Sequence, residues 1–124
     1  MEIYLPLRVS KNNNLSFNLL AVWNFYYQCN SGRFKGVRGD KALEWEALEH
    51  YKSLFKDPIL VAGDWNFGPT FCQRDFVKLA SLFEQSGLKS LYHHYHGLKT
   101  EKTSHSTFKT VTNHFHHLDH MFGS

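Results

Sequence analysis

A short apolar run that ends abruptly in polar residues constrains the fold of this chain more than any other segment. Residues 58–62 have the sequence Pro-Ile-Leu-Val-Ala, and Gly63 separates them from Asp64, Trp65 and Asn66. A run of this length between a proline and a glycine predicts a strand that is buried on both faces. Because side chains alternate along an extended strand, Asp64 and Asn66 should project to one side while Trp65 turns to the other.

The position of Asp64 at the end of this strand predicts a functional site. A carboxylate at the edge of a core is costly unless a cation, a proton or hydrogen bonds compensate its charge. Ligands gather at the carboxyl ends of strands in layered α/β proteins. The pattern also occurs in nucleotide-binding folds, phosphatases and structural turns, so this stretch alone leaves both interpretations open. In either case we expect burial to raise the pKa of Asp64, unless local N–H groups bond its carboxylate.

Length and composition indicate one folded domain. The chain has 124 residues, of which 42% are hydrophobic and 16% aromatic, and its formal net charge of +3 is compatible with phosphate-bearing partners without requiring them. No stretch approaches the roughly 20 apolar residues that cross a bilayer, and the N-terminus lacks a secretory pattern. We therefore expect a soluble, intracellular protein, cytoplasmic if bacterial. Cys29 and Cys72 form no disulfide framework or metal motif, and we expect both to remain thiols.

The pattern of apolar residues predicts an α/β fold. Two strands, separated by a turn-rich Lys-Asn-Asn-Asn segment, suggest a hairpin, and two amphipathic helices are expected to flank the strand that precedes Asp64. The second helix should bury Phe76, Leu79, Ala80 and Phe83 and end near Gly87. The expected strands span residues 3–9, 15–23, 58–66, 107–108 and 115–122, and the expected helices span 41–55 and 74–85.

Three motifs in this order resemble a known superfamily. They are Gly63-Asp64-Trp65-Asn66, Thr107-Phe108, and the closing segment Phe-His-His-Leu-Asp-His-Met-Phe-Gly-Ser over residues 115–124. Together they resemble the endonuclease/exonuclease/phosphatase superfamily of metal-dependent phosphodiesterases. The resemblance implies a four-layer α/β/β/α sandwich, of which this chain would form a mixed sheet with two helices on one face.

The same resemblance implies that part of the superfamily's machinery lies outside this sequence. Members carry an N-terminal half with an active-site Asn and a metal-binding Glu, and a terminal Ser-Asp-His motif with the catalytic His. Neither has a match here. No stretch before residue 58 offers an Asn or a Glu in that setting, and Leu118 stands where Ser would precede Asp119. We therefore expect residues 1–124 to form a single incomplete domain that is inactive when isolated.

The resemblance also assigns roles to individual residues. Asp64 would orient or deprotonate the attacking water and could also touch the metal. Asn66 would donate hydrogen bonds to a phosphate oxygen on which negative charge develops. Asp119 would approach Asp64 from an adjacent strand and would orient the absent His. The implied cofactor is Mg²⁺, or Mn²⁺, with its main ligand in the missing N-terminal half.

A basic loop and an uncovered sheet face are the candidate partner surfaces. Arg33, Lys35 and Arg38 could contact substrate phosphates, although they could equally be solvated charges that offset the acidic helix after them. Thr107 could also face the substrate. Nucleic acid is the preferred substrate class, while inositol phosphates and lipids stay open. The sheet face opposite the helices would be apolar, so we expect the isolated chain to self-associate through it.

Two other functions remain open from the sequence. A non-catalytic remnant of this fold would bind nucleic acid without turnover. A His-rich metal-binding protein would instead fold with zinc, although no spacing matches a familiar zinc motif. On one continuous final strand, His114, His116 and His120 would share a face and His117 would lie on the side of Asp119. The histidines in question are His93, His94, His96, His105, His114, His116, His117 and His120.

Overall fold

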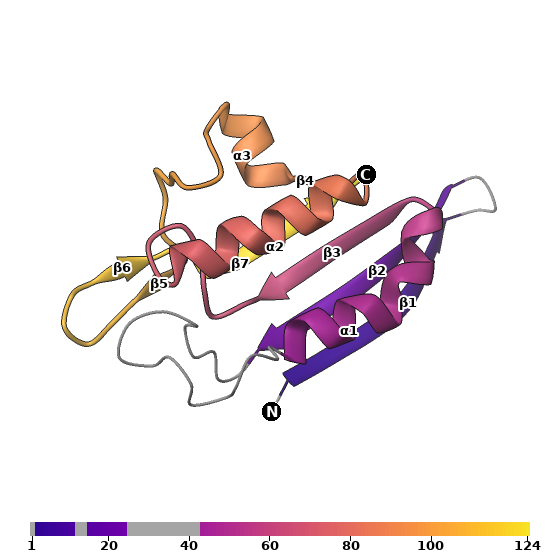
Figure 1. The fold of residues 1–124 in the computed structure, drawn as a ribbon, viewed down its shortest axis with the longest axis horizontal. Helices are drawn as coiled ribbons and strands as arrows, with labels where there is room; N and C mark the ends of the chain where they lie inside the picture. The colour runs from indigo at the N-terminus through magenta and orange to yellow at the C-terminus, as the bar shows by residue number, and fades with distance from the viewer. Residues whose placement is uncertain (1, 12–14, 25–42) are drawn as a thin grey trace.

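A mixed five-stranded sheet forms the centre of the protein (Figure 1). The computed structural model describes residues 2–11, 15–24 and 43–124. Strands β2 and β3 pair in parallel, and the other neighbours pair antiparallel. The strands, in their order across the sheet, are β1 (Glu2–Lys11), β2 (Leu15–Asn24), β3 (Ile59–Asp64), β7 (Asp119–Gly123) and β4 (Lys89–Ser90).

Two helices cover one face of this sheet, as the sequence predicts. Helix α1 (Leu43–Tyr51) continues into the 3₁₀ helix η2 (Lys52–Lys56) and lies over β1 and β2, while α2 (Gln73–Gln85) lies over β3 and β7 (Figure 1). A short helix α3 (Leu91–His96) follows the edge strand β4, and a small hairpin of β5 (Phe108–Lys109) and β6 (Phe115–His116) projects from the body. The fold class is therefore α/β.

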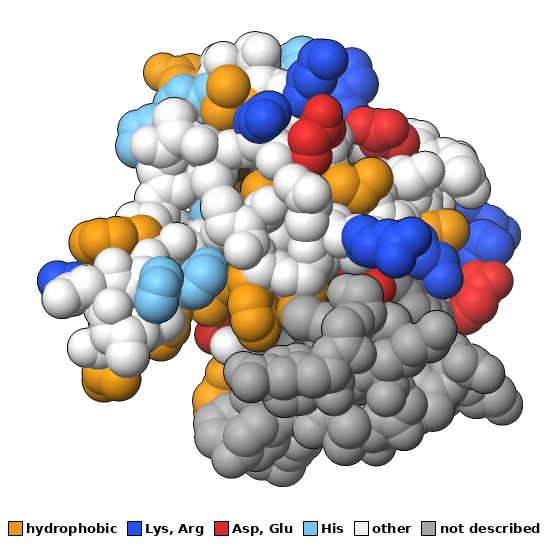
Figure 2. Space-filling model, turned by 60° about the vertical axis from the view of Figure 1, so that its left-hand side comes forward, with side chains coloured by type: hydrophobic (Ala, Val, Ile, Leu, Met, Phe, Trp, Pro, Cys, Tyr) orange, Lys and Arg blue, Asp and Glu red, His pale blue; other side chains and the backbone are white. Residues whose placement is uncertain are grey.

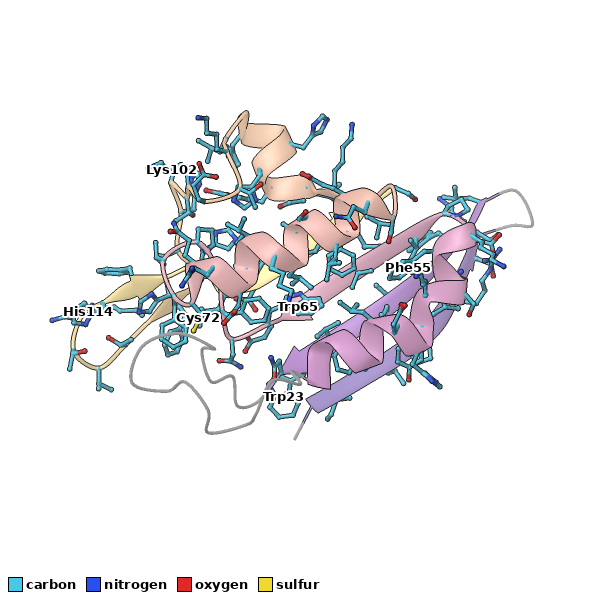
Figure 3. All side chains as sticks on the ribbon, in the orientation of Figure 1. Trp23, Phe55, Trp65, Cys72, Lys102 and His114 are labelled. Carbon is cyan, nitrogen blue, oxygen red and sulfur yellow. The ribbon has the colours of Figure 1, made fainter. Side chains whose placement is uncertain are left out.

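The core lies between the sheet and these helices, and aromatic side chains fill its centre. Trp65 is fully buried, and its ring meets those of Phe83 and Phe122 edge-on, at centroid distances of 5.9 and 6.4 Å. Figure 3 labels Trp65 beside the end of β3, between α1 and α2 in this view. Each such side chain contributes roughly 1.5–3 kcal/mol of hydrophobic stabilisation. The four residues that the sequence assigned to the buried side of α2 are all buried.

The opposite face of the sheet is only partly covered, which corrects one expectation. Ile59 and Val61 are buried against the helices, whereas Leu60 and Ala62 on the other side of β3 are only half-buried. The prediction that this strand is buried on both faces is therefore wrong within the described residues, because there only the short helix α3 borders this face, and no second layer covers it. We call this surface the open face. Its apolar members are Ile3, Leu5, Leu7, Val9, Leu15, Phe17, Leu19, Ala21, Trp23, Leu60, Ala62 and Met121.

The final predicted strand is divided in two. β6 pairs with β5, whereas β7 pairs with β3, and between them the N–H of Trp65 donates to the carbonyl of Leu118 at 2.9 Å. The chain changes partners at this point, so residues 114–120 do not alternate along one strand. Helix α3 lies outside the strands and helices that the sequence predicts.

The cysteine expectation fails for Cys72, which is disulfide-bonded. Spacing along the sequence gives no measure of which cysteines meet in space. Cys29 lies outside the described residues. Over the described ranges, no helix is long and apolar enough to cross a membrane.

Gly63 permits the close approach of β2 and β3. Its φ is +152°, and a Cβ placed there would lie 1.8 Å from the carbonyl oxygen of Val22. No rotamer relieves such a collision, because both atoms belong to the backbone framework.

We expect Gly63→Ala to lower the free energy of unfolding by at least about 3 kcal/mol, since the strands must separate to admit the methyl group. Urea denaturation measures this change. Gly97→Ala is the matched control, because Gly97 also has a positive φ, of +62°, but no atom lies within 4 Å of its added Cβ. Equal losses in the two variants would contradict the steric argument.

Candidate active site

Asp64 and Asp119 face each other across two neighbouring strands. Asp64 ends β3, Asp119 begins β7, and the two are directly paired in the antiparallel register. Directly paired residues place their Cβ atoms roughly 5 Å apart on the same face of a sheet. The prediction that Asp119 approaches Asp64 from an adjacent strand is thus confirmed, and both lie at one end of the open face.

Burial raises the pKa of Asp64, as expected for an acid at the end of a buried strand. A second, smaller cause is the negative charge of Asp119, which also raises this pKa. The N–H of Asn66 donates to Asp64 Oδ1 at 2.9 Å and lowers the pKa, but it does not cancel the effect of burial. Asp64 therefore keeps its proton to a higher pH than a free aspartate.

Asn66 departs from the predicted alternation. Its φ is +54°, in the left-handed region, so the extended geometry ends at Asp64. The side-chain amide of Asn66 donates to the backbone carbonyl of Asn24 at the end of β2. Asn66 therefore does not have the extended backbone from which its position was predicted. The turn after Asp64 brings the backbone N–H of Asn66 to the carboxylate of Asp64 instead.

Thr107 positions the beginning of β7. Its Oγ1 accepts hydrogen bonds from the N–H groups of Leu118, at 3.0 Å, and Asp119, at 3.2 Å. Thr107 thus lies beside Asp119 and its hydroxyl holds the backbone of that residue, while its contact with substrate stays a prediction. The predicted phosphate contacts Arg33, Lys35 and Arg38 lie outside the described residues.

The acidic pair fits part of a magnesium shell. Mg²⁺ is usually held by one or two carboxylates, with waters and substrate phosphates completing an octahedron. Asp64 and Asp119 could supply such carboxylates. Within the described ranges no group of three or more His, Cys, Asp or Glu side chains has a metal-binding arrangement.

A cavity of about 500 Å³ opens beside Asp119, and nothing in the sequence analysis indicated it directly. The sheet contributes Ala62, Asp119 and Met121 to its wall, and α3 contributes Tyr92 and Tyr95. This cavity was missed because α3 was missed. A helix-ending glycine, Gly97, directly after the aromatic segment was the available signal, since it takes the left-handed conformation typical of that position.

The histidines behind this cavity form an aromatic cluster around Tyr92. The ring centroids of Tyr92 and His117 are 4.3 Å apart, and His117 stacks on His120 at 4.9 Å. The Tyr92 hydroxyl accepts hydrogen bonds from the N–H groups of Ser104, at 2.9 Å, and His105, at 3.1 Å. The cluster therefore fastens the loop around residues 103–105 to α3. Other histidines are exposed around α3 and on the hairpin (Figure 2). One of them, His114, is labelled on the hairpin in Figure 3.

Burial also keeps His120 neutral. Loss of solvent, followed by the nearby His117, lowers the pKa of His120 to about 3. Its Nε2 lies 2.9 Å from the carbonyl oxygen of Phe67, and this arrangement requires Nε2 to carry the proton and donate. Burial lowers the pKa of His93 as well. These histidines are neutral packing groups at neutral pH.

Comparison with known proteins identifies no family for this chain. No family model matches the sequence, and no curated protein matches it.

We expect Asp64→Asn to stabilise the protein near neutral pH. Because the pKa of Asp64 is raised by folding, the unfolded chain ionises first as pH rises, and stability falls until the folded carboxyl also ionises. Asn keeps an oxygen for the N–H of Asn66 and removes this loss. Thermal unfolding from about pH 4 to about pH 8 measures the difference. A variant that is less stable over the whole range would show that Asp64 is a satisfied structural acceptor.

For His120 the sign is opposite. Its folded pKa lies below the ordinary value of 6.5, so the stability present above that value is lost as pH falls toward about 3. We expect His120→Phe to flatten this acid-induced loss, although the variant also loses the bond to Phe67. His114→Phe, at an exposed site on the hairpin, is the control. Identical acid unfolding profiles for wild type and His120→Phe would contradict the burial argument.

Proposed function

We propose that this chain is part of a divalent-metal-dependent phosphodiesterase or nuclease of the endonuclease/exonuclease/phosphatase type. The observation that carries the proposal is the pairing of Asp64 and Asp119 on neighbouring strands, at one end of an apolar sheet face. Two carboxylates held close together at a strand end suit metal-assisted phosphoryl chemistry better than a structural role, since like charges there oppose folding.

Asp64 would act on the attacking water. A carboxyl with a raised pKa lies closer to the working pH of a general base than an ordinary aspartate does. The N–H of Asn66 holds Oδ1, which fixes the orientation of the group and leaves Oδ2 for the water. When bound, Mg²⁺ or Mn²⁺ would neutralise charge on the phosphate and on the acidic pair.

Asp119 and Asn66 would position the other groups. Thr107 fixes the backbone of Asp119, whose exposed carboxylate would orient a catalytic His supplied from outside these residues. Asn66 would have to exchange its present bond to Asn24 for a phosphate oxygen. In this proposal Arg33, Lys35 and Arg38 contact the phosphates of an intracellular nucleic acid.

Metal binding tests the proposal directly. We expect Mn²⁺, in low millimolar or weaker affinity, to broaden the ¹⁵N–¹H resonances of residues around Asp64 and Asp119, because two carboxylates form only part of its shell. Asp64→Asn and Asp119→Asn should each abolish this local broadening. Asp57→Asn is the control, because Asp57 is an exposed acid that pairs with Arg8. Broadening spread evenly over all acidic residues would contradict a site.

For activity we expect no Mg²⁺- or Mn²⁺-dependent cleavage of DNA, RNA or phosphate esters by the isolated chain. The described residues supply three of the groups that the reaction needs, Asp64, Asn66 and Asp119, and none of them is a catalytic His. Cleavage is measured with fluorescent single- and double-stranded oligonucleotides. Turnover that disappears in Asp64→Ala would show that these residues contain a complete site and that the chain is not an incomplete domain.

A further inference from the structure

We propose that the open face is an interface between two copies of this chain, packed face to face with their strands running in opposite directions. Six large apolar side chains on this face stay partly exposed: Ile3 at 40%, Leu5 at 51%, Leu7 at 45%, Leu15 at 60%, Trp23 at 43% and Met121 at 49%. They come from β1, β2 and β7. Strand β3 lies between β2 and β7, so the three strands belong to one continuous surface. This inference does not depend on the proposed function.

The area is sufficient for a specific dimer. Large apolar side chains have surfaces of roughly 150–200 Å², so these half-exposed ones and the smaller residues between them leave roughly 500 Å² on each copy. That is at the upper end for a contiguous apolar patch on a monomer. Two copies would together bury roughly 1,000 Å², which is the lower limit of a specific interface and suits micromolar affinity.

The charges on the open face select the relative orientation of the copies. Asp64 and Asp119 lie at one end, at the level of Ile3 in the register, and Lys11 follows at the other end of the same side of β1. Eight residues of strand separate these levels by roughly 26 Å. Packing with strands in the same direction would bring four carboxylates together. The reversed orientation places the acidic pairs of the two copies at opposite ends of the interface.

The edge of the sheet favours this face-to-face contact over edge-to-edge pairing. β1 is the outer strand, and Pro6 at its middle has no N–H to donate to an added strand. Exposed Arg8 and Lys11 add charge to the same edge. A second copy therefore gains more by covering the open face than by extending the sheet.

The mass of the intact chain in solution tests this interface. We expect light scattering and sedimentation equilibrium to show a monomer–dimer equilibrium with a Kd of about 1–100 μM. Leu5→Lys and Met121→Lys should each weaken dimerisation at least about tenfold. Leu82→Lys is the matched control, because Leu82 is 38% exposed on α2, on the helix side of the molecule. Circular dichroism checks that each variant is folded.

Neutralising one acid tests the orientation. Asp119→Asn should leave the Kd of the dimer unchanged, because the reversed orientation already places the two acidic pairs at opposite ends of the interface. A chain that stays monomeric at about 200 μM overturns the proposal, as do open-ended aggregates or a dimer that neither Leu5→Lys nor Met121→Lys weakens. A dimer that Asp119→Asn tightens overturns the reversed orientation, because only packing in the same direction brings the acidic ends of the copies together.

Discussion

The close parallel pairing of β2 and β3 is the constraint on which the other features depend. It brings the backbone of Val22 against Gly63, where only hydrogen fits, and so aligns Trp23 with Asp64 at the end of the sheet. The same register directs Trp65 into the core beneath α2 and leaves Asp64 on the opposite face. Asp119 then joins the site because β7 pairs with the other side of β3. One glycine thus connects the packing of the core with the geometry of the acidic pair.

The two faces of the sheet differ in what they do for the protein. The helix-facing side carries the close-packed aromatic core and accounts for most of the hydrophobic stabilisation. The open face contributes little to the stability of a single chain, because its apolar side chains remain half in water. It carries the acidic pair instead. The proposed binding and chemistry therefore lie on the side of the sheet whose apolar side chains stay partly exposed after folding.

The sequence was sufficient for those features that depend on local periodicity. Alternation and helical spacing identified the hairpin, α2 with its buried residues, and the strand that ends at Asp64. The pairing of Asp64 with Asp119 came from the resemblance of motifs. Features set by tertiary contacts could not be read in this way. The left-handed turn at Asn66, the change of partner at Leu118 and the bonded state of Cys72 each depend on a neighbour distant in sequence. Helix α3 is too short for its periodicity to be distinguished from a loop.

The attachment of the β5–β6 hairpin has a dynamic consequence. The hydroxyl of Thr107 accepts hydrogen bonds from the N–H groups of both Leu118 and Asp119. In a continuous sheet, the backbone carbonyls of a neighbouring strand would accept such bonds. Among the described residues no backbone ladder joins the hairpin to the main sheet, and His116 reaches the body through contacts with Thr70 and Phe71. We therefore expect the hairpin to move on this side-chain attachment without disturbing the register of β7. Opening of the hairpin and opening of the sheet would then be separate events, with separate free energies of local unfolding.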